Sequence, residues 1–252
     1  MKYLPIVLSV MMAGVLSVSC SEDNNPVVAV EPTAEEGFIE INGGGASFPN
    51  MVFVNLSEEE QVAVPRESWD LSFTNGSGFE VLINGTTGAM AYPTGKQTFE
   101  EVEAETMEML RTEGKLVLDF NNMVSRRYVD DPNNPWVNGT AIQPVSANMA
   151  ENQVYIYSRG ESGAAERPWV LLRVDRESNA YKLTYKEVGG TERSAVIAKG
   201  SDTHMNYFSF TADAVVQVEP ARKKWDFVWT AGTNEIRFLP GRMVLSPTSF
   251  RI

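Results

Sequence analysis

The stretch from Asn206 to Trp229, NYFSFTADAVVQVEPARKKWDFVW, decides how this chain folds. Its apolar residues alternate along three short runs, which are Phe208 and Phe210, then Val216 and Val218, then Trp225, Phe227 and Trp229. Alternation at every second residue places the members of each run on one face of a β-strand. The stretch therefore predicts a strand, a turn, a short strand, a second turn and a final strand.

A similar pattern occurs roughly 155 residues earlier in the chain. There, VNL at 54–56 and VAV at 62–64 precede WDLSF at 69–73, as the later runs precede WDFVW at 225–229. We predict two related Trp-Asp strand units, the first unit at about residues 51–73 and the second unit at about 205–229. The two units are expected to be halves of one β-sheet framework.

The remaining sequence adds further strands and one clear helix. Alternating segments lie at 79–83, 153–158, 168–174, 180–187 and 193–198, with turn sequences between several of them. A capping box of Thr98 and Glu101, followed by an apolar stripe, predicts a helix over Phe99–Thr112. Leu116–Phe120 is either a strand or a second short helix. The prediction is an all-β, mainly antiparallel fold with one or two short helices, in a single domain over residues 37–252.

One segment has no periodic pattern. Residues 130–139, DDPNNPWVNG, are rich in turn-forming residues and carry a tryptophan. An irregular loop of this length is typically functional rather than a simple connection. We therefore expect the functional site between Leu116 and Ala150.

The N-terminus resembles a bacterial lipoprotein signal over residues 1–19. An apolar run from Leu4 to Leu16 is followed by Ser17-Val18-Ser19 and then by Cys20, the only cysteine in the chain. The resemblance implies that Cys20 becomes the lipidated first residue, with residues 20–36 as a flexible tether. The acidic start after Cys20 is similar to the surface-export tag of Bacteroidetes lipoproteins. The alternative is an ordinary secretory signal that happens to precede a cysteine.

Composition disfavours several functions. The formal net charge of −12 disfavours nucleic acid as a partner. His204 is the only histidine, and no nucleophile elbow or zinc-ligand pattern accompanies it. A hydrolase using paired carboxylates is left open by the many acidic residues, but no spacing singles out a pair. We therefore predict a binding protein and not an enzyme.

Several motifs together resemble the HmuY family of Bacteroidetes lipoproteins. They are WDLSF at 69–73, NGTTGAMAY at 84–92, NQVYIYSRG at 152–160, YFSF at 207–210, VVQVEP at 215–220 and KKWDFVWT at 223–230. The resemblance covers residues 38–230 and implies an all-β fold. It also implies a lipid-anchored outer-membrane protein at the cell surface that binds haem and passes it to a TonB-dependent receptor.

The same resemblance implies methionine ligands for the haem iron, because His204 stands alone. Eight methionines follow the signal: Met51, Met90, Met107, Met109, Met123, Met149, Met205 and Met243. Met123 and Met149 are the expected pair, since they bracket the irregular loop in the region where the family carries its ligands. The alternative is that both are packing or loop residues.

Four further residues in that segment are candidate haem contacts. Arg126 and Arg127 are expected to pair with the propionates, unless they form only an exposed basic pair. Tyr128 and Trp136 are expected to pack against the porphyrin, unless they are core aromatics. The competing function is a non-haem surface adhesin or receptor-accessory module that binds a protein, peptide or glycan through an exposed apolar patch.

Overall fold

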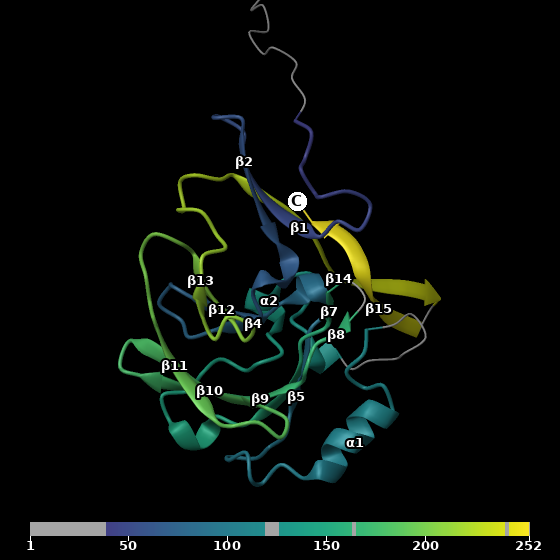
Figure 1. The fold of residues 1–252 in the computed structure, drawn as a ribbon, viewed down its shortest axis with the longest axis vertical. Coiled ribbons are helices and arrows are strands. Elements are labelled where there is room, and N and C mark those ends of the chain that lie inside the picture. The colour runs from purple at the N-terminus through teal and green to yellow at the C-terminus, as the bar shows by residue number, and fades with distance from the viewer. Residues whose placement is uncertain (1–38, 119–125, 163–164, 240–241, 252) are drawn as a thin grey trace, which may run out of the picture. The chain divides into compact units, whose positions relative to one another are not determined.

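The computed structural model describes residues 39–118, 126–162, 165–239 and 242–251. Three antiparallel sheets form its framework (Figure 1). The predicted all-β, mainly antiparallel class is confirmed, since the strands in these ranges pair in the antiparallel sense.

Each sheet draws on strands from distant parts of the chain. Sheet A has the order β15-β14-β1-β2, with β1 (Asn50–Asn55), β2 (Glu60–Pro65), β14 (Phe227–Leu239) and β15 (Arg242–Arg251). Sheet B has the order β13-β12-β3-β4, with β3 (Leu71–Thr74), β4 (Val81–Ile83), β12 (Met205–Ser209) and β13 (Ala214–Val216). Sheet C has the order β11-β10-β9-β6-β5, with β5 (Met90–Pro93), β6 (Tyr155–Ser158), β9 (Val170–Glu177), β10 (Ala180–Glu187) and β11 (Arg193–Ala198).

Short elements connect these sheets. The helical elements are α1 (Ala104–Thr112), α2 (Pro135–Asn138), and the 3₁₀ turns η1 (Arg66–Ser68), η2 (Gly85–Thr87), η3 (Arg126–Tyr128) and η4 (Met149–Glu151). A small ribbon pairs β7 (Glu161–Ser162) with β8 (Ala165–Glu166). The described part of the segment Leu116–Phe120, residues 116–118, is neither strand nor helix.

The helix α1 begins later than the capping box predicts. The Glu101 carboxylate accepts the backbone N–H groups of Gln97 and Thr98 at 2.9 and 2.8 Å, which closes a separate turn. The chain is then extended at Glu103, with φ −70° and ψ 138°, and the helix starts at Ala104. The prediction of a helix from Phe99 was therefore wrong for its first turn.

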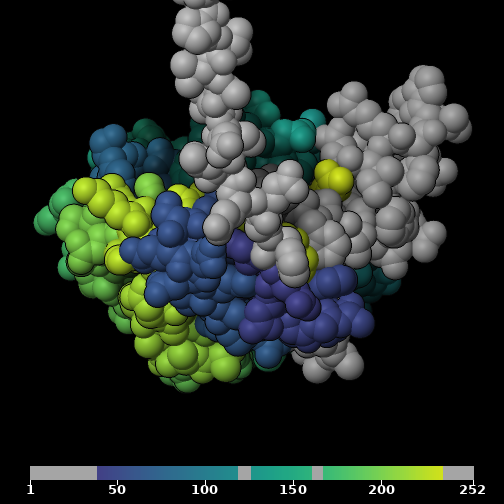
Figure 2. Space-filling view, turned by 90° about the horizontal axis from the view of Figure 1, so that it is seen from above, coloured from purple at the N-terminus to yellow at the C-terminus, as the bar shows by residue number. Residues whose placement is uncertain are grey.

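The two Trp-Asp units exchange strands between sheets A and B. The first unit places its hairpin β1–β2 in sheet A and its strand β3 in sheet B, whereas the second places hairpin β12–β13 in sheet B and β14 in sheet A. As a result β1 pairs with β14 and β3 pairs with β12. In Figure 2, blue residues of the first unit adjoin yellow-green residues of the second.

The two Trp-Asp units also make equivalent hydrogen bonds through their aspartates. The N–H of Asp70 donates to Phe208 O, and that of Asp226 donates to Val54 O, both at 2.8 Å. Each carboxylate also accepts the N–H of the residue two positions after that backbone partner. The Phe210 N–H donates to Asp70 at 2.8 Å, and the Leu56 N–H donates to Asp226 at 2.7 Å.

The tryptophans are matched as well. Trp69 meets Tyr207 edge to face with ring centroids 5.1 Å apart, and Trp225 meets Phe53 in the same way at 5.2 Å. All four rings belong to one apolar cluster between sheets A and B. Each Trp-Asp pair therefore has two structural roles. The indole packs in this cluster, and the carboxylate accepts a backbone N–H just beyond the neighbouring strand.

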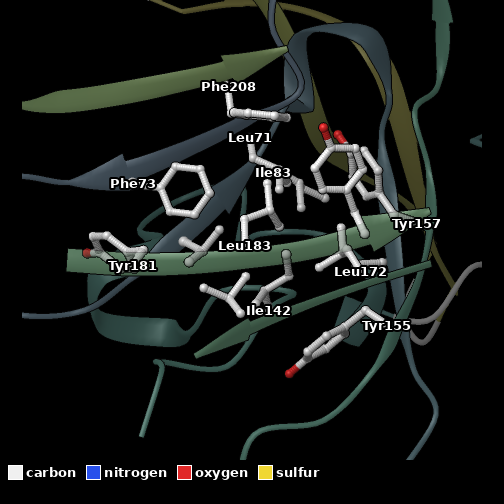
Figure 3. Packing of buried hydrophobic residues seen from close by; sticks show 14 of the residues in the cluster. Leu71, Phe73, Ile83, Ile142, Tyr155, Tyr157, Leu172, Tyr181, Leu183 and Phe208 are labelled. Carbon is white, nitrogen blue, oxygen red and sulfur yellow. The ribbon is translucent and has the colours of Figure 1, made fainter. Parts of the chain in front are cut away.

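Two more clusters complete the interior. Sheets B and C face each other across the largest, in which Leu71 and Phe208 lie opposite Leu183 and Tyr181 (Figure 3). The other face of sheet C, including Met90 and Ile156, packs with Phe99 and with Met107 and Leu110 of α1. Both clusters reach the irregular segment, the largest through Ile142 and Val145 and the other through Tyr128 and Val129.

The first unit has an additional buried ion pair. Arg159, just after β6, donates from Nε and a terminal nitrogen to the two carboxylate oxygens of Asp70 at 2.8 and 2.9 Å. Arg167 adds a contact at 3.2 Å, and the Tyr157 hydroxyl donates to the Asp70 carbonyl at 2.7 Å. Asp70 is 0% exposed and the Arg159 side chain 4%, so this network is anchored in the interior.

A glycine allows the two halves of this network to approach. Gly160 has a φ of +68°, and a β-carbon there would lie 2.0 Å from the Thr87 carbonyl oxygen. Any other residue at this position would therefore clash with η2. Thr87 also donates its hydroxyl to the Arg159 carbonyl at 3.0 Å, which joins the NGTTGAMAY and NQVYIYSRG motifs at Asp70.

We predict that Asp70→Asn lowers the free energy of unfolding by about 3–5 kcal/mol, because it leaves two buried guanidinium groups without their counter-charge. Asp226→Asn is the matched control, since Asp226 caps its strand in the same way but is exposed. Its expected cost is below about 1 kcal/mol. Urea unfolding followed by tryptophan fluorescence measures the free energy of unfolding of both variants. Equal decreases in the two variants would show that the ion pairs of Asp70 with the arginines do not stabilise the fold.

Candidate functional site

The candidate site is the irregular segment between α1 and β6, described from Arg126 onward. It contains η3, α2 and η4 and makes few backbone ladder contacts. Its shape is held by two neighbouring carboxylates, Asp130 and Asp131, which have opposite roles.

Asp131 organises the loop tip locally. Its Oδ1 accepts the N–H groups of Asn133 and Asn134 at 2.9 Å each and the Asn138 side-chain amide at 3.0 Å, while Oδ2 pairs with Arg126. Burial alone would raise the pKa of Asp131, but these donors together hold that pKa below its usual value. Asp131 therefore ties η3 to the short helix α2 as an ionised carboxylate.

Asp130 fastens the same loop to sheet B. It accepts the N–H of Ile83 in β4 and the N–H of Ala141, both at 2.9 Å. A bridge between Val81 and Ile142 continues this attachment. Burial raises the pKa of Asp130 to about 7, although the two backbone hydrogen bonds oppose the shift.

Tyr128 lies against the second apolar cluster. Its ring meets Tyr92 of β5 with centroids 5.3 Å apart and is partly buried there. Burial raises the pKa of Tyr128, so the phenol is neutral at physiological pH. The adjacent Arg127 is exposed, and so is the side chain of Arg126, at 43%.

Trp136 is not a core aromatic. It is 56% exposed on α2, and the next residue, Val137, is 77% exposed. Both lie on α2, which Asp131 holds through the Asn134 N–H and the Asn138 side chain, so two apolar side chains face solvent from a braced turn.

Met149 is also accessible, but it is held by a different part of the chain. It begins η4 and is 56% exposed, and its carbonyl accepts a hydrogen bond from Arg173 of β9 at 2.7 Å. Arg173 also donates to the Gln97 carbonyl at 2.6 Å. Met123 and Cys20 lie outside the described residues.

The other described methionines divide by burial. Met51, Met90 and Met107 are buried in apolar clusters, Met205 is partly buried, and Met109 is 36% exposed. Over the ranges that the structure covers, no group of three or more His, Cys, Asp or Glu side chains is placed to hold a metal ion. An accessible thioether such as that of Met149 fits the soft donor that the sequence predicts for haem iron.

The structure thus brings together some of the predicted residues. Asp131 joins Arg126 to the helix that carries Trp136, and Tyr128 lies within the same segment, whereas Met149 is fixed to Arg173. Sequence reasoning missed the roles of Asp130 and Asp131. The available signal was the run DDPNN, because aspartate before asparagine is typical of side-chain-capped turns.

No helix within the described ranges is both long and apolar enough to cross a bilayer.

The raised pKa of Asp130 predicts a pH effect on stability. A folded-state pKa of about 7 lies above the ordinary 3.8, so the stability contributed by Asp130 is present in acid and is lost as pH rises through 7. Other carboxylates titrate too, so the measured quantity is the difference in unfolding free energy between wild type and Asp130→Asn. Relative to the variant, wild type should weaken by up to about 1.4 kcal/mol per pH unit from pH 5 to 7. A difference that does not change with pH would contradict this assignment.

Comparison with known proteins identifies the family. The family model described as HmuY protein matches residues 47–192, more than half of the 252-residue chain. The match includes the first Trp-Asp unit, the Asp70–Arg159 pair and the whole irregular segment. No curated protein and no solved structure gave a significant match. On the strength of the family match, the chain belongs to the HmuY family, a family of haem-binding surface proteins.

Proposed function

We propose that this protein is a lipid-anchored haem-binding protein of the cell surface that serves haem and iron acquisition. The observation that carries the proposal is membership of the HmuY family over residues 47–192. The proposed anchor is the lipid on Cys20, in the outer membrane, and the proposed recipient of the haem is a TonB-dependent outer-membrane receptor.

Met123 and Met149 are the residues proposed to hold the haem iron. The accessible side chain of Met149 supports its role. Bound haem would supply an iron centre, and soft thioether ligands favour its ferrous state. Methionine does not titrate near neutral pH, so ligation itself should be insensitive to mild acid, unlike a histidine pair.

The remaining candidates have different proposed tasks. The exposed guanidinium groups of Arg126 and Arg127 would bind the carboxylates of the propionates. Tyr128 and Trp136 would pack against the porphyrin, and the exposure of Trp136 supports this for that ring. Asp131 would hold Arg126 and the α2 turn in place.

A second candidate function is a non-haem module that binds a protein, peptide or glycan. The exposed pair Trp136 and Val137 favours it, because aromatic side chains presented to solvent are common in recognition sites. It differs from the first candidate in requiring no haem complex.

A haem titration distinguishes the two. Mature protein with dithionite-reduced haem should give a discrete Soret band, and Met123→Ala or Met149→Ala should weaken binding at least about tenfold. Met109→Ala is the matched control, since Met109 is an exposed methionine on α1. If haem forms no discrete complex in the oxidised state and none in the reduced state, the haem function is excluded. If Met109→Ala weakens haem binding as much as Met123→Ala or Met149→Ala, the ligand assignment is excluded.

The lipid anchor is tested separately in cells. Cys20→Ser should abolish incorporation of labelled palmitate and release the protein from the membrane fraction, because lipid attachment requires the thiol. A wild-type protein that incorporates no palmitate would instead support an ordinary secretory signal.

A further inference from the structure

The internal relation between the two Trp-Asp units provides a template for a second binding site. At Asp70, three residues drawn from both units bind the side chain of Arg159. Asp70 binds its guanidinium at two points, the Thr211 hydroxyl accepts a third hydrogen bond at 2.6 Å, and the ring of Phe210 lies 5.8 Å from its central carbon. Carboxylate, hydroxyl and apolar side chain together form an arginine receptor.

Asp226 of the second unit has the same kinds of residue at the corresponding positions of its partner hairpin, which belongs to the first unit. Asp226 corresponds to Asp70, because each accepts the N–H two residues beyond its backbone partner. That residue is Leu56 in one unit and Phe210 in the other, and the next residue is Ser57 or Thr211.

The hairpin turns that carry these residues also match. Glu59 and Asp213 both have left-handed backbone conformations, with φ 54° and 53°. In each turn a polar side chain accepts the N–H three residues on, Asn55 from Glu58 at 3.0 Å and Ser209 from Ala212 at 3.3 Å. The correspondence therefore includes the loop that positions Ser57 and Thr211.

The two receptors differ in what occupies them. Sheet C covers the site at Asp70 and inserts Arg159, so that Phe210 is only 5% exposed. At the Asp226 site Leu56 is 55% exposed, and Ser57 and Asp226 are exposed too. Asp226 uses Oδ2 for the Leu56 N–H, and no described residue donates to its Oδ1.

Two of the three nearby cations are engaged by other residues. Lys224 pairs with Glu58 at 3.1 Å, and Arg222 donates to the Thr203 carbonyl at 2.9 Å. The third, Lys223, is exposed. None of these cations forms an ion pair with Asp226 in the described structure, and the formal net charge of −12 favours a cationic partner.

We propose that Asp226, Ser57 and Leu56 form an open receptor for an arginine side chain of a partner protein. An arginine is specified over a lysine, because a planar guanidinium bonds a carboxylate at two points and a neighbouring hydroxyl at a third. The receptor is separate from the irregular segment, and it does not depend on haem binding.

The test uses haem-free, isotope-labelled mature protein and a synthetic capped peptide YSRG, the sequence of residues 157–160. NMR titration should shift the amide signals of Leu56, Ser57 and Asp226. Asp226→Asn should weaken binding about fivefold, the upper range for an exposed ion pair, and replacing the peptide's arginine by lysine should weaken it similarly.

Two further variants keep the result interpretable. Ser57→Ala removes only the hydroxyl and leaves the Leu56 cap in place, so it should weaken the arginine peptide and not the lysine peptide. Glu187→Gln, an exposed acidic residue on β10, is the charge-matched control and should have no effect. Shifts located elsewhere, equal binding of the two peptides, or equal effects of Asp226→Asn and Glu187→Gln would overturn the proposal.

Discussion

The buried carboxylate of Asp70 is the constraint on which the rest of the fold depends. Through its side chain it binds Arg159, Arg167 and the N–H of Phe210, and through its backbone it contacts β12, η2 and the hydroxyl of Tyr157. These contacts join sheet B to the end of β6 in sheet C. A buried charge is destabilising unless it is paired and hydrogen-bonded, so the surrounding motifs are restricted together. Gly160 shows this restriction, because its close approach to Thr87 leaves no room for a β-carbon.

Strand exchange between the two Trp-Asp units gives each sheet one hairpin and one returning strand from opposite ends of the chain. Similar cap and ring geometries recur at Asp70 with Trp69 and at Asp226 with Trp225. The Asp70 site, which uses strands of both units, is closed by sheet C and stabilises the fold. The Asp226 site is open at the surface, where we propose that the same residue types bind an outside partner. The same arrangement of carboxylate, hydroxyl and apolar side chain can thus stabilise the fold at Asp70 and bind a partner at Asp226.

Sequence periodicity predicted the strands well, because alternation reports which face of a strand is buried. It did not predict the pairing of Asp70 with Arg159, since residues 89 positions apart carry no local signal of contact. The hydrogen bond between Thr98 and Glu101 that the capping box predicts is present, but it closes a separate turn, and the chain is extended at Glu103 before α1. In the irregular segment the sequence indicated a functional loop, and the run DDPNN carried a local signal for Asp131, whereas the role of Asp130 depends on the N–H of Ile83, 47 residues away. The pairing of Met123 with Met149 remains a prediction, because Met123 lies outside the described residues.

The central functional proposal is that two methionine thioethers of this chain, which has a single histidine, hold haem iron. The irregular segment carries the candidate contacts, and Asp130 and Asp131 fix its position. Family membership supports haem as the proposed ligand. The most direct measurement is NMR of the reduced haem complex with methyl-labelled methionine. Two methyl signals, assigned to Met123 and Met149 by substitution, should move far upfield, because axial ligands lie within the shielding region of the porphyrin ring. Methionine signals that keep their positions when haem binds would contradict the account.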